Sequence, residues 1–230
     1  MNKIRKYYEK NPMGAPSDES EQIKQRYKLI SDFIEDKSFF RTLDLGCGKE
    51  LLMKEIKMNS QQFIGVDISK NSIKSAKKTN NGIHFIVSDA SELPFDSKTF
   101  DCIICSEVLE HIPKFSKSLS EISRICKKNS FLIITTPNYF IQRLYKKIKF
   151  LKPYKFREGE FEQVYDKPIP YILIKKELEE KHFKEVILTS FYYSFFLQGK
   201  FINFLSKFLE KKVKIRLGHY LFFIFWRGDK

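Results

Sequence analysis

Short apolar runs alternate with stretches of helical periodicity through the first 138 residues. Runs rich in Val, Ile, Leu, Phe and Cys predict buried strands over 42–45, 63–66, 84–87, 102–105 and 131–135. Apolar positions that recur at helical spacing predict helices over 19–35, 50–58, 70–78 and 117–127. Strands and helices that alternate at this pace form βαβ units, so we expect a parallel sheet covered on both faces.

The pattern loosens after residue 138. Two amphipathic helices, with Lys and Arg beside their apolar stripes, are predicted near 140–148 and 200–210. Periodicity predicts another helix over 174–182 and strands over 184–192 and 219–227. The sheet of the first part is therefore expected to continue into the second.

All four cysteines, Cys47, Cys102, Cys105 and Cys126, lie in apolar segments. Residues three apart on a strand point to opposite faces, so Cys102 and Cys105 suit neither a disulfide nor a shared metal. With 230 residues, 42% of them hydrophobic, the chain can bury one large core without cross-links. We expect four buried free thiols.

Neither end of the sequence has the hydropathy of a membrane or export signal. Residues 1–9 are polar and aromatic and lack the apolar core of about 7 to 15 residues that a signal peptide requires. The most apolar late run, 220–226, is far shorter than the roughly 20 residues of a membrane span. We expect a cytoplasmic protein without a transmembrane segment.

The net charge of +14 is distributed unevenly. Residues 1–138 hold 22 basic and 18 acidic side chains, whereas residues 139–230 hold 20 and 10. This surplus can attract phosphates, anionic lipid or nucleic acid, or it can simply keep a lysine-rich protein in solution.

Acidic residues and glycines occur where the predicted strands end. In the segment LDLGCG, Asp44 precedes Gly46 and Gly48 at a strand-to-helix turn, where glycines let the backbone approach a ligand. Asp67 ends the second strand, in the position from which a carboxylate accepts hydrogen bonds from ribose hydroxyls. Asp89 follows the third strand, where it can bind the exocyclic amine of an adenine. Together these residues indicate a nucleoside ligand.

A dinucleotide is disfavoured as that ligand. The dinucleotide fingerprint requires a third glycine at position 51, which is Leu51 here. Asp44 would also repel a phosphate, whereas it suits the ammonium of a bound amino acid. Each acid has a purely structural alternative as a helix cap or turn former, but three of them at three strand ends favour a shared ligand.

Read together, these segments resemble the class I S-adenosylmethionine-dependent methyltransferases. The resemblance covers about residues 27–138 and rests on five motifs in order, TLDLGCG, FIGVDIS, SDASELPF, DCIICSEVLEHI and TTPN. It implies a Rossmann-like, seven-stranded α/β sheet, mostly parallel with an antiparallel last strand. It also implies one domain that comprises an N-terminal cap (1–36), a cofactor-binding half (37–138) and an acceptor-side half (139–230).

By that resemblance, S-adenosylmethionine is the cofactor and eight residues contact it. They are Asp44, Gly46 and Gly48 beside its methionine part, Asp67 and Ile68 at the ribose and adenine, Asp89 and Ala90 at the adenine, and Ser106 near the sulfonium. The chain departs from the family at Glu50, where a third glycine is usual. This departure leaves open an altered cofactor pose or an inactive relative.

The ExxEH segment, Glu107, Glu110 and His111, is the candidate for catalysis and for metal binding. On a helix these positions share one face and would present two carboxylates and an imidazole, a set that can hold Mg²⁺. The segment is similar to that of ubiquinone-biosynthesis O-methyltransferases and small-RNA 2′-O-methyltransferases. The alternative is that Glu107 lines the acceptor pocket and His111 satisfies a backbone carbonyl.

Three functions remain open from the sequence. The aromatic and basic inserts favour a methyltransferase that acts at oxygen or carbon of a small or lipid-like acceptor, with peripheral contact to an anionic membrane as one use of the basic helices. Those apolar stripes can instead pack on the sheet. The basic last part raises RNA as a less favoured acceptor, and Glu50 raises a non-catalytic cofactor-binding scaffold.

Overall fold

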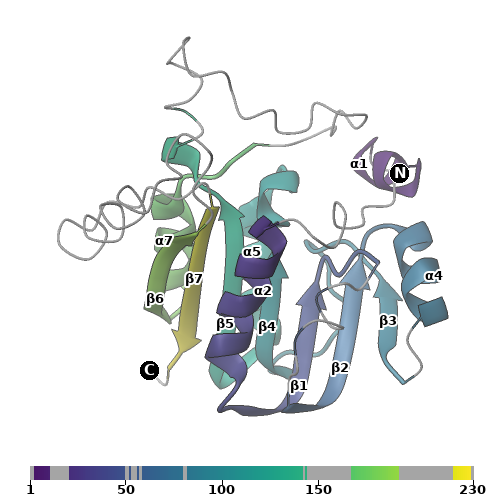
Figure 1. Ribbon diagram of the computed structural model, residues 1–230, viewed down its shortest axis with the longest axis horizontal. Helices are drawn as coiled ribbons and strands as arrows, with labels where there is room; N and C mark the ends of the chain where they lie inside the picture. Colours follow the sequence, from purple (N-terminus) through teal and green to yellow (C-terminus); the bar gives the residue numbers. More distant parts are fainter. Residues whose placement is uncertain are drawn as a thin grey trace.

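A seven-stranded sheet in the order β3-β2-β1-β4-β5-β7-β6 forms the centre of the protein (Figure 1). The computed structural model describes residues 3–10, 21–49, 52, 56, 59–79, 82–141, 143, 167–191 and 220–228. The strands are β1 Ser38–Leu45, β2 Asn59–Asp67, β3 His84–Val87, β4 Phe100–Ser106, β5 Cys126–Pro137, β6 Phe183–Phe191 and β7 Tyr220–Arg227. Strands β1 to β5 pair in parallel, and β7 is antiparallel to β5 and β6. The predicted fold class is confirmed.

Helices cover both faces of this sheet. They are α1 Lys3–Lys10, α2 Glu21–Ile34, α4 Lys70–Thr79, α5 Phe115–Ile125 and α7 Tyr171–Glu179, with a short 3-10 helix, η1, at Leu109–His111. The sequence did not predict α1. The helices predicted over 50–58, 140–148 and 200–210 fall largely outside the described residues.

Four strands, β1, β2, β4 and β5, begin earlier than apolar runs alone predict. Strand β1 starts at Ser38 because its first residues pair with the start of β2, Ser38 opposite Asn59. The helix predicted over 117–127 ends at Ile125, since Cys126 already pairs with Phe100 of β4. Polar residues such as Arg41, Lys127 and Lys128 interrupt the apolar pattern of these extensions, which are held by backbone pairing that hydropathy does not report.

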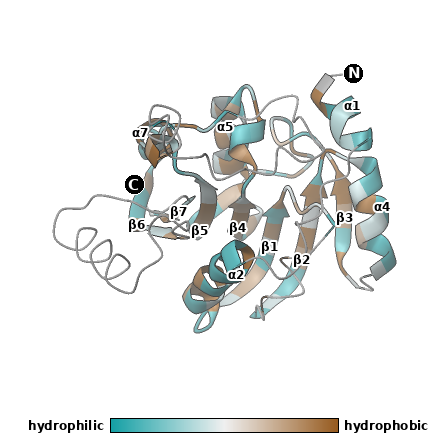
Figure 2. Ribbon diagram, turned by 45° about the horizontal axis from the view of Figure 1, so that its top comes forward, coloured by the Kyte–Doolittle hydropathy of each residue, from teal (hydrophilic) through white to brown (hydrophobic). Residues whose placement is uncertain are grey.

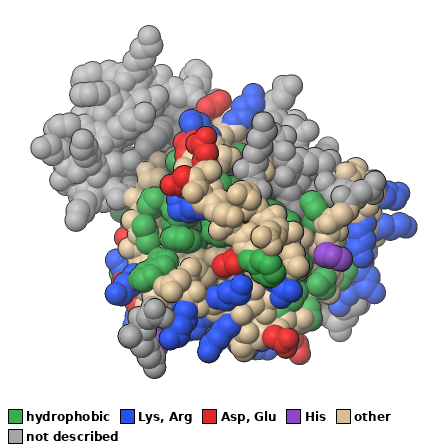
Figure 3. Space-filling view, turned by 90° about the horizontal axis from the view of Figure 1, so that it is seen from below, with side chains coloured by type: hydrophobic (Ala, Val, Ile, Leu, Met, Phe, Trp, Pro, Cys, Tyr) green, Lys and Arg blue, Asp and Glu red, His purple; other side chains and the backbone are tan. Residues whose placement is uncertain are grey.

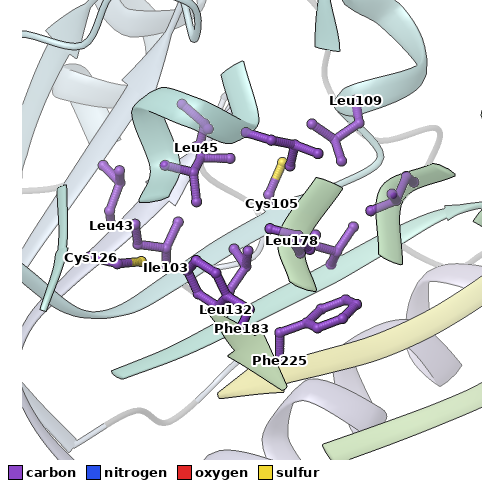
Figure 4. Close-up of a cluster of buried hydrophobic side chains, with 14 of the residues drawn as sticks. Leu43, Leu45, Ile103, Cys105, Leu109, Cys126, Leu132, Leu178, Phe183 and Phe225 are labelled. Carbon is purple, nitrogen blue, oxygen red and sulfur yellow. The ribbon is translucent and has the colours of Figure 1, made fainter. Parts of the chain in front are cut away.

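Alternation along the central strands divides the core into two apolar layers. Ile103, Cys105 and Leu132 face α5 and α7 (Figure 4), whereas Cys102 and Ile104 face α2. Figure 2 shows hydrophobic strands between helices whose outer faces are hydrophilic. All four cysteines are buried and free. Cys102 and Cys105 thus lie on opposite faces, and the prediction of buried thiols is confirmed.

The parallel strands end together at one edge of the sheet, the upper edge in Figure 1, here called the carboxyl edge. Its register brings Leu45 beside Val66 and Cys105, and Asp67 beside Val87. Ligands of open α/β sheets bind outside such an edge. Within the described ranges, no helix is long and apolar enough to cross a membrane.

Candidate cofactor site

The loop after β1 is pinned against the end of β2. The backbone N–H groups of Gly46 and Cys47 both donate to the carbonyl oxygen of Val66, at 2.7 and 3.0 Å. Gly46 has a φ of 78°, and a Cβ there would lie 2.3 Å from a methyl carbon of Val108. Only glycine fits such a position. The close approach of the end of β2 and the segment after β4 to this loop therefore explains the glycine at position 46.

Asp67 joins this loop to the start of α4. One carboxylate oxygen, Oδ2, accepts a hydrogen bond from Gly48 N at 3.0 Å, and the other, Oδ1, accepts one from Ser69 N at 2.8 Å. Burial raises the pKa of Asp67, and these two N–H donors oppose that rise. The carboxylate is therefore held at the end of β2 in a fixed orientation, as a ribose-binding acid requires.

Asp44 is the buried acid of the site. It is 2% exposed, and its Oδ2 atom has no hydrogen-bond partner. Burial, followed by the charge of Asp67, raises the pKa of Asp44 to about 7, while the positive charge of Arg26 opposes the rise. A buried carboxyl oxygen without a donor costs free energy that a cationic ligand would recover. The residue therefore fits an ammonium group beside the glycine loop.

Arg26 is the site residue that the sequence analysis missed. It projects from α2 and lies near both Asp44 and Glu107. Its positive charge opposes the rise in the pKa of each of these acids. Its Nε atom is buried without a hydrogen-bond partner. The available signal was its position between Ile23 and Ile30, on the stripe of α2 that packs against the sheet. A cation on an apolar stripe needs an anionic partner in the interior.

The remaining cofactor residues predicted from sequence also lie along the carboxyl edge. Asp89 follows β3 and is partly accessible, and its Oδ1 atom accepts a hydrogen bond from Ser91 N at 2.8 Å. Ser106 ends β4, where its hydroxyl lies 3.0 Å from Thr135 Oγ1. Ile68 directly follows Asp67, and Ala90, like Asp89, is partly buried. Their contacts with a cofactor stay predictions.

The ExxEH segment is not the continuous helix that the sequence suggested. Glu107 has a φ of 56°, which a non-glycine residue rarely adopts, and it precedes η1, which contains Glu110 and His111. The expectation of one shared helical face is therefore wrong, because the chain turns sharply between Glu107 and η1. Strain of this kind persists where surrounding contacts hold it, here the hydrogen bond from Glu107 N to Thr135 O at 3.0 Å.

Glu107 is nevertheless a perturbed acid at the carboxyl edge. Burial raises its pKa to about 8, and the nearby charge of Glu110 adds to the rise. Thr135 Oγ1 donates a hydrogen bond to Glu107 Oε1 at 2.7 Å. Glu110 is 1% exposed and accepts a hydrogen bond from Thr136 Oγ1, and one of its oxygens lies 3.9 Å from Nε2 of His111. A buried carboxyl group with its pKa raised in this way can exchange a proton near neutral pH.

The donor set for Mg²⁺ is not present in the expected form. Among the residues that the structure describes, no group of three or more His, Cys, Asp or Glu side chains is arranged to hold a metal ion. Glu107, Glu110 and His111 therefore do not form the predicted metal site in this geometry. The turn at Glu107, with its φ of 56°, replaces the helical geometry on which that prediction depended.

A cavity of about 470 Å³ lies elsewhere, between α2 and strands β6 and β7. It is lined by residues such as Asp32, Phe33, Ile187 and Phe222. None of the strand-end residues described above borders it, so we place the chemistry at the carboxyl edge, where the perturbed acids gather.

The comparisons with known proteins agree with the carboxyl-edge geometry. Residues 43–134, which contain the glycine loop, Asp67, Asp89 and the turn at Glu107, match the family model described as "Methyltransferase domain". The chain carries a class I, S-adenosylmethionine-dependent methyltransferase domain. The candidate site residues of this methyltransferase domain come from the ends of β1 to β4, with Arg26 added from α2.

Two curated relatives illustrate the similarity of this methyltransferase domain. A fatty-acid O-methyltransferase of Mycolicibacterium smegmatis is 28% identical over 150 residues, 59% of this chain and 53% of the relative. A ubiquinone biosynthesis O-methyltransferase of Pelagibacter ubique is 31% identical over 144 residues, 57% of this chain and 60% of the relative. The similar region thus spans little more than half the length of these relatives.

Solved structures share the fold of the methyltransferase domain. The N-methyltransferase NodS from Bradyrhizobium japonicum, in complex with S-adenosyl-L-homocysteine, has a TM-score of 0.69 at 12% identity. The superposition covers 99% of this chain and 100% of NodS. The arrangement of strands and helices is therefore shared far beyond residues 43–134.

Proposed function

We propose that this chain is a methyltransferase that uses S-adenosylmethionine to methylate oxygen or carbon of a small or lipid-like acceptor. The observation that carries the proposal is the buried Asp44 carboxyl, whose Oδ2 atom has no donor, beside a glycine loop hydrogen-bonded to Asp67. A ligand with an ammonium group and a ribose meets the needs of both acids.

The cofactor's polar groups can be matched to residues one by one. Asp44 takes the ammonium, and Arg26, which has an unsatisfied buried nitrogen on the same side, takes the carboxylate of the methionine part. Asp67 takes the ribose hydroxyls, and Asp89 with Ala90 takes the adenine. This assignment satisfies the buried polar atoms of Asp44 and Arg26, which otherwise have no partner.

Bound S-adenosylmethionine supplies an electrophilic methyl group on positively charged sulfur. The protein aligns the acceptor with that methyl and excludes water. Alignment alone can lower the activation free energy by about 7 to 11 kcal/mol. Glu107 is the group we assign to proton removal, because its pKa of about 8 lets it exchange a proton near neutral pH. Glu110 and His111 assist Glu107 in this role. The charge of Glu110 helps to raise the pKa of Glu107, and His111 lies beside Glu110.

Apolar surface near this edge supports a lipid-like acceptor. Phe140, just after β5, is 61% exposed, and Ile172 and Leu173 at the start of α7 are 64% and 46% exposed. The segment before α7 is tied to η1 by a hydrogen bond from Lys167 N to Glu110 O at 3.0 Å. The fatty-acid and quinone-pathway names of the two relatives point to the same class of acceptor.

The basic surplus is a weaker guide to the acceptor. On the face opposite the carboxyl edge, Lys and Arg side chains lie both at the margins and toward the middle (Figure 3). Peripheral binding to an anionic membrane and RNA methylation both use positive charge, and both weaken as salt is raised. The lipid-like acceptor is preferred because exposed apolar side chains follow β5 and begin α7, whereas charge alone does not select an acceptor.

The decisive experiment measures cofactor binding and methyl transfer separately. Calorimetry with S-adenosylhomocysteine should give micromolar binding that is lost in Asp44→Asn and Asp67→Ala but kept in Asp32→Asn, an exposed acid of α2. Extracts incubated with methyl-labelled cofactor should then place label in the lipid or small-molecule fraction. Binding without transfer in any fraction would favour the scaffold, and label in RNA would favour the RNA enzyme.

A further inference from the structure

Two hydroxyl groups connect the end of β4 to the carboxyl group of Glu107. Ser106 and Thr135 are partners in the register of β4 and β5, neighbouring strands at the centre of the sheet (Figure 1), so their side chains share one face. Their hydroxyl oxygens lie 3.0 Å apart. Thr135 Oγ1 in turn lies 2.7 Å from Oε1 of Glu107. The three side chains therefore form one continuous hydrogen-bonded chain.

The strained backbone of Glu107 closes this chain. With its φ of 56°, Glu107 donates its backbone N–H to the carbonyl oxygen of Thr135 at 3.0 Å. Its carboxyl group accepts a hydrogen bond from the hydroxyl of the same threonine. A positive φ is unfavourable for a glutamate, and such strain is found where function requires a side chain in a fixed place. The turn that replaces the expected helix thus holds the carboxyl group on Thr135.

The middle of the chain is the part that solvent does not reach. Ser106 and Glu107, at its two ends, are partly accessible, whereas Thr135 between them is 0% exposed. A proton that moves along hydrogen bonds from one end to the other would therefore pass through the hydroxyl of Thr135.

The number of hydroxyl hydrogens sets the direction of the chain when Glu107 is ionised. A carboxylate only accepts hydrogen bonds, so the single hydroxyl hydrogen of Thr135 goes to Glu107. Thr135 can then only accept from Ser106, which commits the hydrogen of Ser106 as well. The lone pairs of Ser106 Oγ are left to accept a hydrogen bond from a ligand. Ionised Glu107 thus makes Ser106 a hydrogen-bond acceptor at the carboxyl edge.

We propose that Ser106 and Thr135 relay a proton from a hydroxyl group of the methyl acceptor to Glu107. The inference rests on the proposed function and deepens it, because it selects an oxygen acceptor over a carbon one. It also selects a hydroxyl, as in a phenol or an alcohol, over a carboxylate, which has no proton to lose.

The relay balances in protons and charge. As the acceptor oxygen forms its bond to the methyl carbon, its proton passes to Ser106 Oγ. The Ser106 proton passes to Thr135 Oγ1, and the Thr135 proton passes to Glu107 Oε1. The bond between the methyl carbon and sulfur breaks, and its electron pair stays on sulfur. The positive charge on sulfur and the negative charge on Glu107 are neutralised together.

The bond that carries a transferred label tests the class of acceptor before the acceptor is identified. Cell extract is incubated with the protein and methyl-labelled S-adenosylmethionine, and the labelled product is treated with mild alkali and then with hot hydriodic acid. We expect a methyl ether, which survives alkali and releases its label as methyl iodide in the acid. Release in alkali would indicate a methyl ester, and resistance to both treatments a methyl group on carbon. Either result would overturn the relay and leave the methyltransferase standing.

Substitutions of Ser106 test the relay itself. Ser106→Ala should lower the rate of ether formation at saturating cofactor by about 10²-fold, the lower end of what proton transfer contributes. Ser106→Thr keeps a hydroxyl and should recover most of the rate. Calorimetry with S-adenosylhomocysteine separates this loss from a loss of cofactor binding, and Ser120→Ala, which removes an exposed hydroxyl of α5, is the matched control. A full rate in Ser106→Ala would show that Glu107 takes the proton without the relay.

Infrared titration of the ligand-free protein gives a readout that is independent of methyl transfer. The carboxyl band of Glu107 is identified by its loss in Glu107→Gln. Ser106→Ala should raise the pKa of Glu107, because Thr135 loses the donor that strengthens its own bond to the carboxylate, and Ser106→Thr should restore the pKa. The other charges that act on Glu107, those of Glu110, Arg26 and His111, are the same in both variants.

The two proposals fail in different ways. An unchanged pKa of Glu107 in Ser106→Ala would overturn the continuous chain, while binding of S-adenosylhomocysteine and transfer of label would keep the proposed function. Absence of both binding and label would defeat the proposed function, and the relay with it.

Discussion

Thr135 Oγ1 donates a hydrogen bond of 2.7 Å to Oε1 of Glu107, across the gap between the ends of β5 and β4. The bond stabilises the carboxylate form, yet burial dominates and raises the pKa of Glu107 to about 8. In the ligand-free protein Glu107 is therefore mostly protonated at pH 7. A positively charged ligand beside it would increase its ionised fraction.

Activity should rise with pH as Glu107 loses its proton. For an acceptor hydroxyl, Glu107→Gln should lower kcat by about 10²- to 10⁴-fold and abolish the rise. Thr135→Val should shift the rise to higher pH, because the hydrogen bond that favours the carboxylate is removed. The measurement is kcat from pH 6 to 9, with the exposed Glu92→Gln as control. An unchanged profile in Glu107→Gln would contradict the role in proton removal.

The stability of the ligand-free protein should fall as pH rises, whereas activity should rise, because Asp44 is a buried acid. The pKa of Asp44 is about 7 in the folded state, against 3.8 for an ordinary aspartate. The folded state therefore holds a proton that the unfolded state releases, so this residue lowers the free energy of unfolding as pH rises from about 4 to 7. The loss is at most about 4 kcal/mol.

Urea unfolding at pH 5 and pH 8 measures this effect. Asp44→Asn should reduce the difference between the two pH values and leave the part that Glu107 contributes, while Asp32→Asn, which is 54% exposed, should leave the difference unchanged. Saturating S-adenosylhomocysteine should also reduce it in the wild type, because its ammonium would pair with the Asp44 carboxylate. Equal pH dependence in wild type and Asp44→Asn would show that the carboxyl titrates normally.

Arg26 should discriminate between ligands with and without an amino-acid part. Arg26→Gln should weaken S-adenosylhomocysteine about 10- to 100-fold, the value of a charged hydrogen bond. The affinity for methylthioadenosine, which lacks the carboxylate and the ammonium, should not change. Calorimetry with both ligands makes the comparison, and Lys24→Gln, exposed on the same helix, is the control. Equal losses for both ligands would indicate a structural role instead.

The glycine loop allows its two constraints to be separated. Gly46→Ala combines a positive φ with a Cβ placed 2.3 Å from Val108. Gly82→Ala has a φ of 98° and nothing within 4 Å, so it measures the cost of the backbone conformation alone, about 1 kcal/mol. Gly46→Ala should cost more and abolish ligand binding, and Val108→Ala in the same chain should recover part of the stability. Thermal unfolding of the variants, with calorimetry for binding, provides the check.

Site residues placed by local sequence patterns could be predicted from the sequence, and site residues placed by tertiary contacts could not. Asp44, Asp67 and Asp89 follow apolar runs, so parallel pairing alone places them at one edge. Arg26 comes from a different helix, and no local pattern states which strand end it faces.

The turn at Glu107 escaped prediction for a related reason. The residues Glu107 to His111 have good helical spacing, but Glu107 N is bonded to Thr135 O in the neighbouring strand. That contact, distant in sequence, overrides the local preference and forces a positive φ. Helix α1 was missed because its docking partners, Ser69 to Asn71, lie some sixty residues away.

The insertion of β7 between β5 and β6 has a consequence for synthesis of the chain. Strand β5 ends at Pro137, yet the strand that pairs with its far side begins only at Tyr220. While the polypeptide emerges from the ribosome, β5 keeps an unpaired edge until those later residues are translated. Growing chains with such edges are prone to association, so we expect nascent intermediates of this protein to depend on chaperones more than the finished molecule does.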